Sequence, residues 1–258
     1  MLAIRVSGVD VTFTTASGPI QALSDIAIDI AEGQFCVLIG PSGCGKSTLL
    51  RVIADLQAPD RGEVRVLGSN PAEARLARRI SFVFQEATLL PWRSVVDNVR
   101  LPLQVGNWTS AGRPHRDPNE LIRLVGLGGR ESALSHQLSG GQRQRVAIAR
   151  ALVTRPDVLL MDEPFGALDE ITRERLNDEM LKIWQETGTT IVFVTHSLSE
   201  AAFLGQSVAV MAAHPGRMVR IVNLEGEKPQ GAIDRSSSRF FGITSDLRRH
   251  LETAEGMA

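Results

Sequence analysis

The chain has 258 residues, a length that one hydrophobic core with an inserted lobe usually supports. Its composition, 43% hydrophobic and 22% charged, is typical of a soluble α/β protein and excludes a disordered, fibrous or disulfide-rich chain. The formal net charge of -1 provides no electrostatic footprint for nucleic acid, so we expect no nucleic-acid partner.

The two cysteines, Cys36 and Cys44, are too few for a disulfide framework or a zinc site, and they fit a reducing compartment. The amino-terminal residues lack a basic segment followed by an apolar one, and no apolar run approaches the roughly 20 residues that cross a bilayer. We therefore expect a chain that is neither exported nor membrane-spanning. Any role at a membrane would depend on a partner.

Apolar and polar residues alternate over residues 4–37, around turns at Gly18-Pro19 and Glu32-Gly33, which predicts short antiparallel strands. An apolar strand over residues 34–39 then leads into a glycine-rich turn and a helix over 47–54. Further apolar runs span residues 80–84, 158–161 and 190–195. Strands that are apolar on both faces indicate a parallel sheet covered by helices.

The strand pattern stops between about residues 86 and 145, where Pro, Gly and Asn interrupt short helical patterns such as residues 119–125. We interpret residues 87–145 as an inserted helical lobe in a core made of residues 1–86 and 146–220. Residues 221–258 form a short, polar extension, with a last helix expected at about 244–251.

The segment GPSGCGKS follows the predicted strand, opens the predicted helix and satisfies the phosphate-loop pattern G-x-x-x-x-G-K-[ST]. Its glycines allow backbone N–H groups to turn toward phosphate oxygens, and the positive end of the helix adds to that attraction. Lys46 can then reach the β and γ phosphates, and the Ser47 hydroxyl can bind Mg²⁺. We therefore expect ATP and Mg²⁺ as cofactors. The expected nucleotide-binding residues here are Gly40, Pro41, Ser42, Gly43, Cys44, Gly45, Lys46, Ser47 and Thr48.

The segment VLLMDE, residues 158–163, is an apolar strand that ends in two adjacent carboxylates. Ligands of parallel sheets bind at the carboxyl ends of the strands. Asp162 could hold Mg²⁺ while Glu163 polarises the attacking water. Alone, such a run would more often be an ordinary strand end, but together with the phosphate loop it indicates half of one site.

The segment LSGGQ, which begins at Leu138, resembles the signature of the ATP-binding cassette (ABC) ATPase family and precedes the Asp-Glu strand as it does there. The resemblance extends from Val11 to about His196 and includes Gln85 and the turn FGALD at residues 165–169. It implies an α/β fold: a P-loop NTPase (RecA-like) core, an N-terminal antiparallel β subdomain and an inserted helical subdomain. It also implies an ATPase that works as a head-to-tail pair, with ATP sandwiched between the phosphate loop of one copy and the signature of the other.

The resemblance assigns further roles. Gln85 would sense the γ-phosphate and join Ser47 and Asp162 at Mg²⁺, and His196 would hold the γ-phosphate and orient Glu163. Taken singly, Gln85 and His196 would be interpreted as solvated residues. The implied catalytic residues are Glu163, His196, Gln85 and Lys46, and the signature residues implied to act on the partner's nucleotide are Ser139, Gly140, Gly141 and Gln142.

One departure concerns adenine, on which the family usually stacks an aromatic residue, often Tyr. This chain has no Tyr, and it offers Phe13 instead. Stacking needs only the face of a ring, so Phe13 is the expected adenine contact, with a place in the core as the alternative.

The residues EATLLPWRSVVDN after Gln85, together with Pro215-Gly216-Arg217, resemble the ATPases of nitrate, sulfonate and taurine importers, a group that also handles pyrimidine precursors of thiamine. This resemblance implies separate transmembrane permease subunits, a substrate-binding protein and a position on the cytoplasmic face of the cell membrane. Trp92 stands between Pro91 and Arg93 in a loop, where a large aromatic residue is more typical of an interface anchor than of a core. We therefore expect residues 90–92 to line a groove that receives a short permease helix, with packing inside the lobe as the alternative.

Other functions have weaker support. An ABC ATPase of another transporter class is the main alternative. Soluble ABC machinery would resemble chains with tandem cassettes or coiled-coil insertions, and this chain shows neither. A P-loop kinase or GTPase would have no use for the signature, and no N-K-x-D guanine motif occurs. A catalytically inactive cassette disagrees with the presence of Glu163 and His196.

Overall fold

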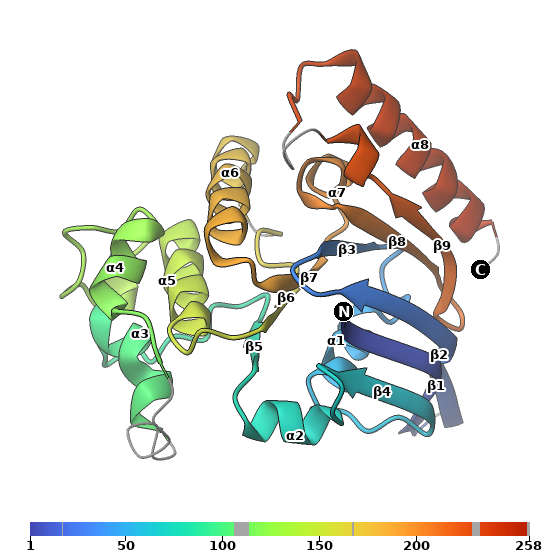
Figure 1. Ribbon diagram of the computed structural model, residues 1–258, viewed down its shortest axis with the longest axis horizontal. Coiled ribbons are helices and arrows are strands. Elements are labelled where there is room, and N and C mark those ends of the chain that lie inside the picture. The colour runs from blue at the N-terminus through green and yellow to red at the C-terminus, as the bar shows by residue number, and fades with distance from the viewer. Residues whose placement is uncertain (17, 106–113, 167, 229–232, 257–258) are drawn as a thin grey trace.

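The computed structural model describes residues 1–16, 18–105, 114–166, 168–228 and 233–256, and a six-stranded sheet lies at its centre (Figure 1). The strand order is β5-β6-β7-β3-β8-β9, and neighbouring strands are parallel except for the antiparallel pair β8 and β9. The strands are β3 (Phe35–Ile39), β5 (Ile80–Val83), β6 (Val158–Asp162), β7 (Thr190–Val194), β8 (Ser207–Ala212) and β9 (Arg217–Asn223). The parallel sheet expected from the apolar runs is confirmed.

A second, antiparallel sheet has the order β2-β1-β4 and is formed by β1 (Leu2–Thr15), β2 (Gly18–Ala31) and β4 (Arg61–Val66). The expected antiparallel subdomain is confirmed, but two strands of 14 residues replace the short strands that we expected. They stay paired because register shifts, such as the one between Val6 and Val9, absorb the irregular places in the alternation.

Helices begin where a short polar side chain accepts a hydrogen bond from the first turn, as Ser94, Asp117, Asp169 and Ser237 do. The helices are α1 (Lys46–Ile53), α2 (Pro71–Leu76), α3 (Val95–Gln104), α4 (Pro118–Leu124), α5 (Gly140–Leu152), α6 (Glu170–Thr187), α7 (Leu198–Leu204) and α8 (Ser238–Glu255). The described residues also include two short 3-10 turns, η2 (Ser135–Gln137) and η3 (Glu225–Glu227).

The central sheet is buried on both faces, as its uninterrupted apolar strands predict. Alternate residues of β6 divide between two cores: Leu160 joins the core shared with α1 and the antiparallel sheet, and Leu159 joins the core shared with α5, α6, α7 and α8. Both cysteines are buried and free. The carboxyl ends of the strands stay open for the loops that carry the predicted site.

Helices α3, α4 and α5 pack together in a lobe beside the β5 edge of the sheet, on the left of Figure 1. They lie in the region where we expected an inserted helical lobe, but α5 continues to Leu152, past the expected boundary at residue 145. The part of that region from 106 to 113 lies outside the described residues.

The carboxyl-terminal extension packs on the opposite edge, where α8 contacts α7 and β8. Its helix is longer than the expected residues 244–251, because Ser237 caps a helix that buries Phe240 and Ile243 before that span begins. Lys228 is 3% exposed and donates from Nζ to the carbonyl oxygens of Phe203 and Gly205. Burial lowers the pKa of Lys228 to about 7. Within the extension, residues 229–232 and 257–258 lie outside the described part.

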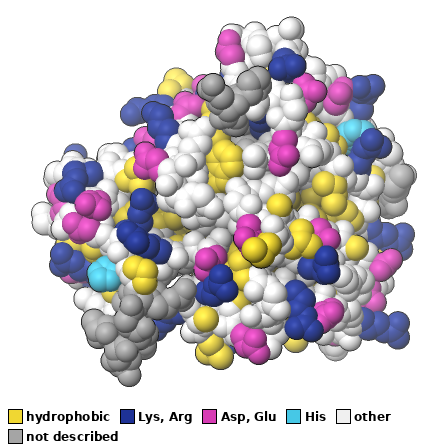
Figure 2. Space-filling model, viewed as in Figure 1, with side chains coloured by type: hydrophobic (Ala, Val, Ile, Leu, Met, Phe, Trp, Pro, Cys, Tyr) yellow, Lys and Arg dark blue, Asp and Glu magenta, His cyan; other side chains and the backbone are white. Residues whose placement is uncertain are grey.

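Acidic and basic side chains are interspersed over the face seen in Figure 2 and do not gather by sign. Among the helices of the described residues, none has the length and apolar character needed to cross a membrane.

Candidate nucleotide site

The glycine-rich loop between β3 and α1 has no room for a side chain at two positions. Gly45 precedes α1 with φ 90°, and a Cβ there would lie 2.5 Å from Leu23 Cδ2. A Cβ on Gly40 would lie 2.6 Å from the Met211 carbonyl oxygen. Neighbouring residues such as Leu23 and Met211 therefore pack closely against the loop. The amino end of α1 follows the loop directly, as phosphate binding requires.

Lys46, the first residue of α1, folds back over this loop. Its Nζ donates to the carbonyl oxygens of Gly40 at 2.8 Å and Pro41 at 2.9 Å, and the side chain is buried. Carbonyl oxygens hold the ammonium without neutralising its charge, so the positive charge remains available to an anion in the cradle.

Ser47 joins the loop to the end of β6. Its Oγ donates to Asp162 Oδ1 at 2.7 Å, and Asp162 is 8% exposed. Burial raises the pKa of Asp162, and the neighbouring Glu163 charge raises it further, while the Ser47 hydrogen bond lowers it. A hydroxyl and a carboxylate that lie 115 residues apart in sequence thus meet at one point.

Glu163 sits just past β6 at φ 44°, a left-handed conformation that is costly for a residue with a Cβ. Its N–H donates to the Val194 carbonyl oxygen at 3.1 Å, which fixes the turn against β7. Gln85 Nε2 lies 3.5 Å and His196 Nδ1 lies 3.4 Å from Glu163 Oε2. Residues that follow the ends of β5 and β7 therefore both contact the carboxylate that follows β6.

A cavity of about 360 Å³ opens beside these groups and is lined by Phe13, Ala22, Ser42, Gly43, Gly45, Lys46, Ser47, Thr48 and Glu163. Phe13 is 37% exposed, so it contributes a ring to the cavity wall and does not belong to the core. The cavity thus brings the predicted adenine residue Phe13 together with part of the phosphate loop and Glu163, whereas other predicted site residues do not line it: Gly40, Pro41, Cys44, Gln85, Asp162 and His196.

The signature residues lie elsewhere. Ser139 caps α5: its Oγ accepts from Gln142 N at 3.3 Å, and its own N–H donates to Gln142 Oε1 at 2.9 Å. Gly140 is exposed, whereas Gly141 is buried, and a Cβ there would lie 3.2 Å from Thr172 Cγ2. None of these residues lines the nucleotide cavity, because α5 belongs to the helical lobe while α1 lies behind the central sheet (Figure 1).

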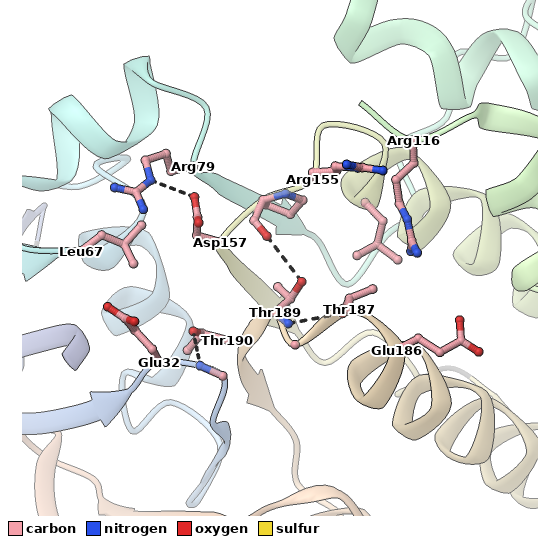
Figure 3. A pocket seen from close by; sticks show the side chains of 14 residues that line it. Glu32, Leu67, Arg79, Arg116, Arg155, Asp157, Glu186, Thr187, Thr189 and Thr190 are labelled. Atoms are coloured by element: carbon pink, nitrogen blue, oxygen red, sulfur yellow. Dashed lines mark hydrogen bonds and ion pairs between the residues drawn. The ribbon is translucent and has the colours of Figure 1, made fainter. Parts of the chain in front are cut away.

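A larger cavity, of about 480 Å³, lies at the other end of the strands (Figure 3). Its groups largely bond one another: Arg79 Nε donates to Asp157 at 2.8 Å, and the hydroxyls of Thr189 and Thr190 bond backbone atoms. None of the predicted site residues lines it. Because it opens at the amino ends of β6 and β7, it faces away from the edge where parallel sheets bind ligands.

Comparison with known proteins decides the family, since the profile described as ABC transporter matches residues 23–166. The chain belongs to the ABC transporter family. It is an ATP-binding subunit of that family, an ATPase whose hydrolysis of ATP drives transport.

Three similar proteins match over most of their length. The taurine import ATP-binding protein TauB of Rhizobium johnstonii is 41% identical, over 98% of each chain. The aliphatic sulfonates import ATP-binding protein SsuB of Bacillus subtilis is 38% identical, over 99% of this chain and 97% of its own length. The nitrate import ATP-binding protein NrtD of Synechococcus elongatus is 40% identical, over 85% of this chain and 80% of its own. The chain is accordingly the ATP-binding subunit of an ABC importer.

The fold matches a solved cassette as well. The ATP-binding cassette MJ0796, solved as a dimer in a post-hydrolysis state bound to ADP and Pi, superposes with a TM-score of 0.73 and is 33% identical. The match covers 86% of this chain and 98% of MJ0796. The fold class expected from the sequence is thereby confirmed, together with the binding of adenine nucleotides by this type of cassette.

Sequence reasoning missed residues that position the cassette's site. Gly216 lies against the phosphate loop, because a Cβ on it would be 2.3 Å from the Cys44 carbonyl oxygen. Buried Asn98 bonds Leu90 and Arg93 in the loop that carries Trp92. The segment around Gly216 was noticed only as a mark of the importer group, and Asn98 could have been recognised as a polar residue on the buried face of a helix.

Proposed function

We propose that the cassette energises the uptake of a small anion, such as taurine, another sulfonate or nitrate, through a separate transmembrane subunit. Support comes from the functions of three similar proteins, which import taurine, aliphatic sulfonates and nitrate. The three relatives are about equally similar to this chain, and each of their cargoes carries a sulfonate or nitrate group.

The nucleotide part of the proposal rests on one observation: Gln85 and His196 converge on Glu163 beside the bonded pair of Ser47 and Asp162. ATP would bind the residues of the phosphate loop, with its adenine on Phe13. Mg²⁺ suits the adjoining oxygens, because a buried carboxylate whose pKa is raised beside a second carboxylate gains most from a bound cation. We assign Ser47, Asp162 and Gln85 to hold the metal, which would neutralise phosphate charge.

The hydrolytic step follows from the same geometry. Glu163 would accept a proton from the water that attacks the γ-phosphate, and His196 would keep the carboxylate pointed toward that water. Lys46, whose charge no carboxylate cancels among its described partners, would stabilise negative charge that builds on the phosphate.

The working unit in this proposal is two chains. The signature residues Ser139, Gly140, Gly141 and Gln142 stand apart from the chain's own cavity, at the exposed amino end of α5. A helix end of this kind attracts phosphate, so a second copy in head-to-tail orientation would complete each site. MJ0796, which is 34% identical, is itself a dimer.

The remaining partners are two permease subunits and, through them, a substrate-binding protein, which would place the cassette at the cytoplasmic face of the membrane. We propose residues 1–220 as one nucleotide-binding domain, with a core of 1–86 and 146–220, a lobe of 87–145 and a carboxyl-terminal extension of 221–258.

Reconstitution tests the cargo. The cassette would be purified with the permease that copurifies with it, placed in proteoliposomes with its binding protein, and assayed for ATPase activity with taurine, an alkanesulfonate, nitrate and an aminopyrimidine in turn. We expect a sulfonate or nitrate to stimulate ATP hydrolysis and to accumulate inside. Stimulation by the aminopyrimidine alone would overturn the cargo class while leaving the ATPase intact.

A further inference from the structure

A polar cluster buried between α6 and α7 lies next to the candidate site but outside the nucleotide cavity. Its members are Thr195, Arg173, Asn177 and Glu200, and three of them are 3–4% exposed. Burial of charge is costly unless the charge is paired and hydrogen-bonded. Burial raises the pKa of the Glu200 carboxyl, while Thr195, Arg173, Asn177 and His196 all act to lower it. Because burying these polar and charged groups costs free energy, we expect the cluster to serve a role.

Helix capping explains only part of this cluster. Ser197 and Glu200 stand in the spacing of a capping box, in which the glutamate would accept from the Ser197 N–H. Here the Ser197 N–H donates to Thr195 Oγ1 at 3.0 Å, and the Thr195 hydroxyl donates to Glu200 Oε2. The carboxylate has thus been turned away from the helix end and toward α6.

On its other side, Glu200 faces α6. Its Oε1 lies 4.0 Å from Arg173 Nε, and Arg173 donates from Nη2 to the Leu168 carbonyl oxygen at 2.7 Å. Leu168 belongs to the loop that leaves Glu163. Within that loop, a Cβ on Gly166 would stand 3.7 Å from both Glu163 Oε2 and His196 Cε1, so the loop lies against the catalytic pair.

These contacts fix both sides of His196, because the residues before and after it, Thr195 and Ser197, are bonded into the cluster. We infer that Glu200 and Thr195 are positioning residues, which hold His196 and the loop after Glu163 in place relative to the Glu163 carboxylate. The inference rests on the proposed roles of Glu163 and His196. Neither Glu200 nor Thr195 lines the nucleotide cavity, so they act through His196 and not on the nucleotide.

The central test uses Thr195→Val, which keeps the side chain's shape and removes the hydroxyl, with Thr195→Ser as the conservative rescue. The full chain would be assayed at a concentration where the rate per chain has levelled off. We expect Thr195→Val to lower kcat about tenfold or more, as small displacements of reacting groups do, with the Kd for ATP changed less than about twofold. Thr195→Ser should retain most of the kcat.

A double-mutant cycle with His196→Ala separates positioning from simple destabilisation. If Thr195 acts through His196, adding Thr195→Val to His196→Ala should lower kcat less than about twofold further. Asp178→Asn is the matched control. Asp178 lies on α6, the helix that carries Arg173, and its Oδ1 forms an ion pair with Arg235 Nη1 at 2.9 Å, outside the cluster. The kcat of Asp178→Asn should stay near that of the wild type.

Two results would contradict the positioning role of Thr195. Near wild-type kcat in folded Thr195→Val, or its full effect repeated in the His196→Ala background, would overturn the inference. Should Thr195→Val not fold, Glu200→Gln replaces it, because Gln still accepts from Thr195 but loses the charge facing Arg173; an unchanged kcat would again overturn the inference. If instead His196→Ala alone left kcat unchanged, the proposed role of His196 would fail, which is a different result.

Discussion

Asp162 and Glu163 are neighbours in sequence with opposite surroundings. Asp162 ends β6, is buried and bonds Ser47, whereas the Glu163 side chain is 25% exposed and turned toward Gln85 and His196. The two side chains point in different directions because the backbone at Glu163 is left-handed. Strain of this kind persists where surrounding structure enforces it, as the bond from Glu163 N to Val194 does here.

Glu163→Gln tests this division of tasks. The amide keeps the shape of the side chain but cannot accept a proton, so kcat should fall by about 10²-fold or more while ATP binding is retained. The measurement is steady-state ATPase activity alongside nucleotide titration. Glu252→Gln, which changes an exposed glutamate of α8, is the control. Near wild-type turnover of Glu163→Gln would remove Glu163 from the proposed mechanism.

At the scale of elements, the loop between β5 and α3 is held by residues remote in sequence. Arg150 of α5 donates to the carbonyl oxygens of Ala87 and Thr88, and Gln144 of the same helix donates to that of Phe84. Asn98 bonds the far end of the loop. The helix that carries the signature therefore also holds the segment around Gln85 through these hydrogen bonds.

Although the loop is held by these bonds, the Trp92 side chain is 73% exposed. This exposure excludes the alternative that Trp92 packs inside the lobe. Exposed aromatic residues on a rigid loop are typical interface anchors, and a permease helix is the partner that we expect. Trp92→Ala should keep the basal ATPase of the isolated cassette and weaken docking to the permease by about 2 kcal/mol, roughly 30-fold in Kd. The assay is copurification together with substrate-stimulated ATPase.

Phe241→Ala provides the matched control, because Phe241 is another exposed aromatic, 62% exposed, on α8 at the far side of the molecule. It should leave both docking and stimulation unchanged. Full transport by folded Trp92→Ala would argue against a docking role for this loop. Loss of both docking and basal activity would point to a structural effect instead.

For the whole molecule, the separation of the signature from the phosphate loop means that one chain holds two incomplete halves. The nucleotide cavity is formed at the carboxyl ends of the strands, while the free end of α5 sits in the helical lobe (Figure 1). A phosphate bound in the cavity receives N–H donors from its own loop only. In the proposed function, a second chain would stabilise the charge of the transition state from the opposite side.

The rate per chain should therefore rise with protein concentration and level off once the dimer dominates. Measurements would combine ATPase assays over a dilution series with light scattering on the same samples. ATP should promote the dimer of Glu163→Gln, in which hydrolysis is slow. A specific rate that stays constant on dilution while the protein remains monomeric would contradict the two-chain site.

The sequence by itself determined the fold class, the family and the list of site residues. Local patterns sufficed because each carries its own physical requirement: the glycines near Lys46 need left-handed backbone, and the run ending at Asp162 needs burial on both faces. Their roles in ATP hydrolysis remain predictions. Only the tertiary structure decided that Gln85 and His196 meet on Glu163, and that the Thr195 hydroxyl bonds the Glu200 carboxylate next to His196. Those contacts join separate strand ends and helices, so their geometry depends on how the sheet is assembled and not on any local spacing.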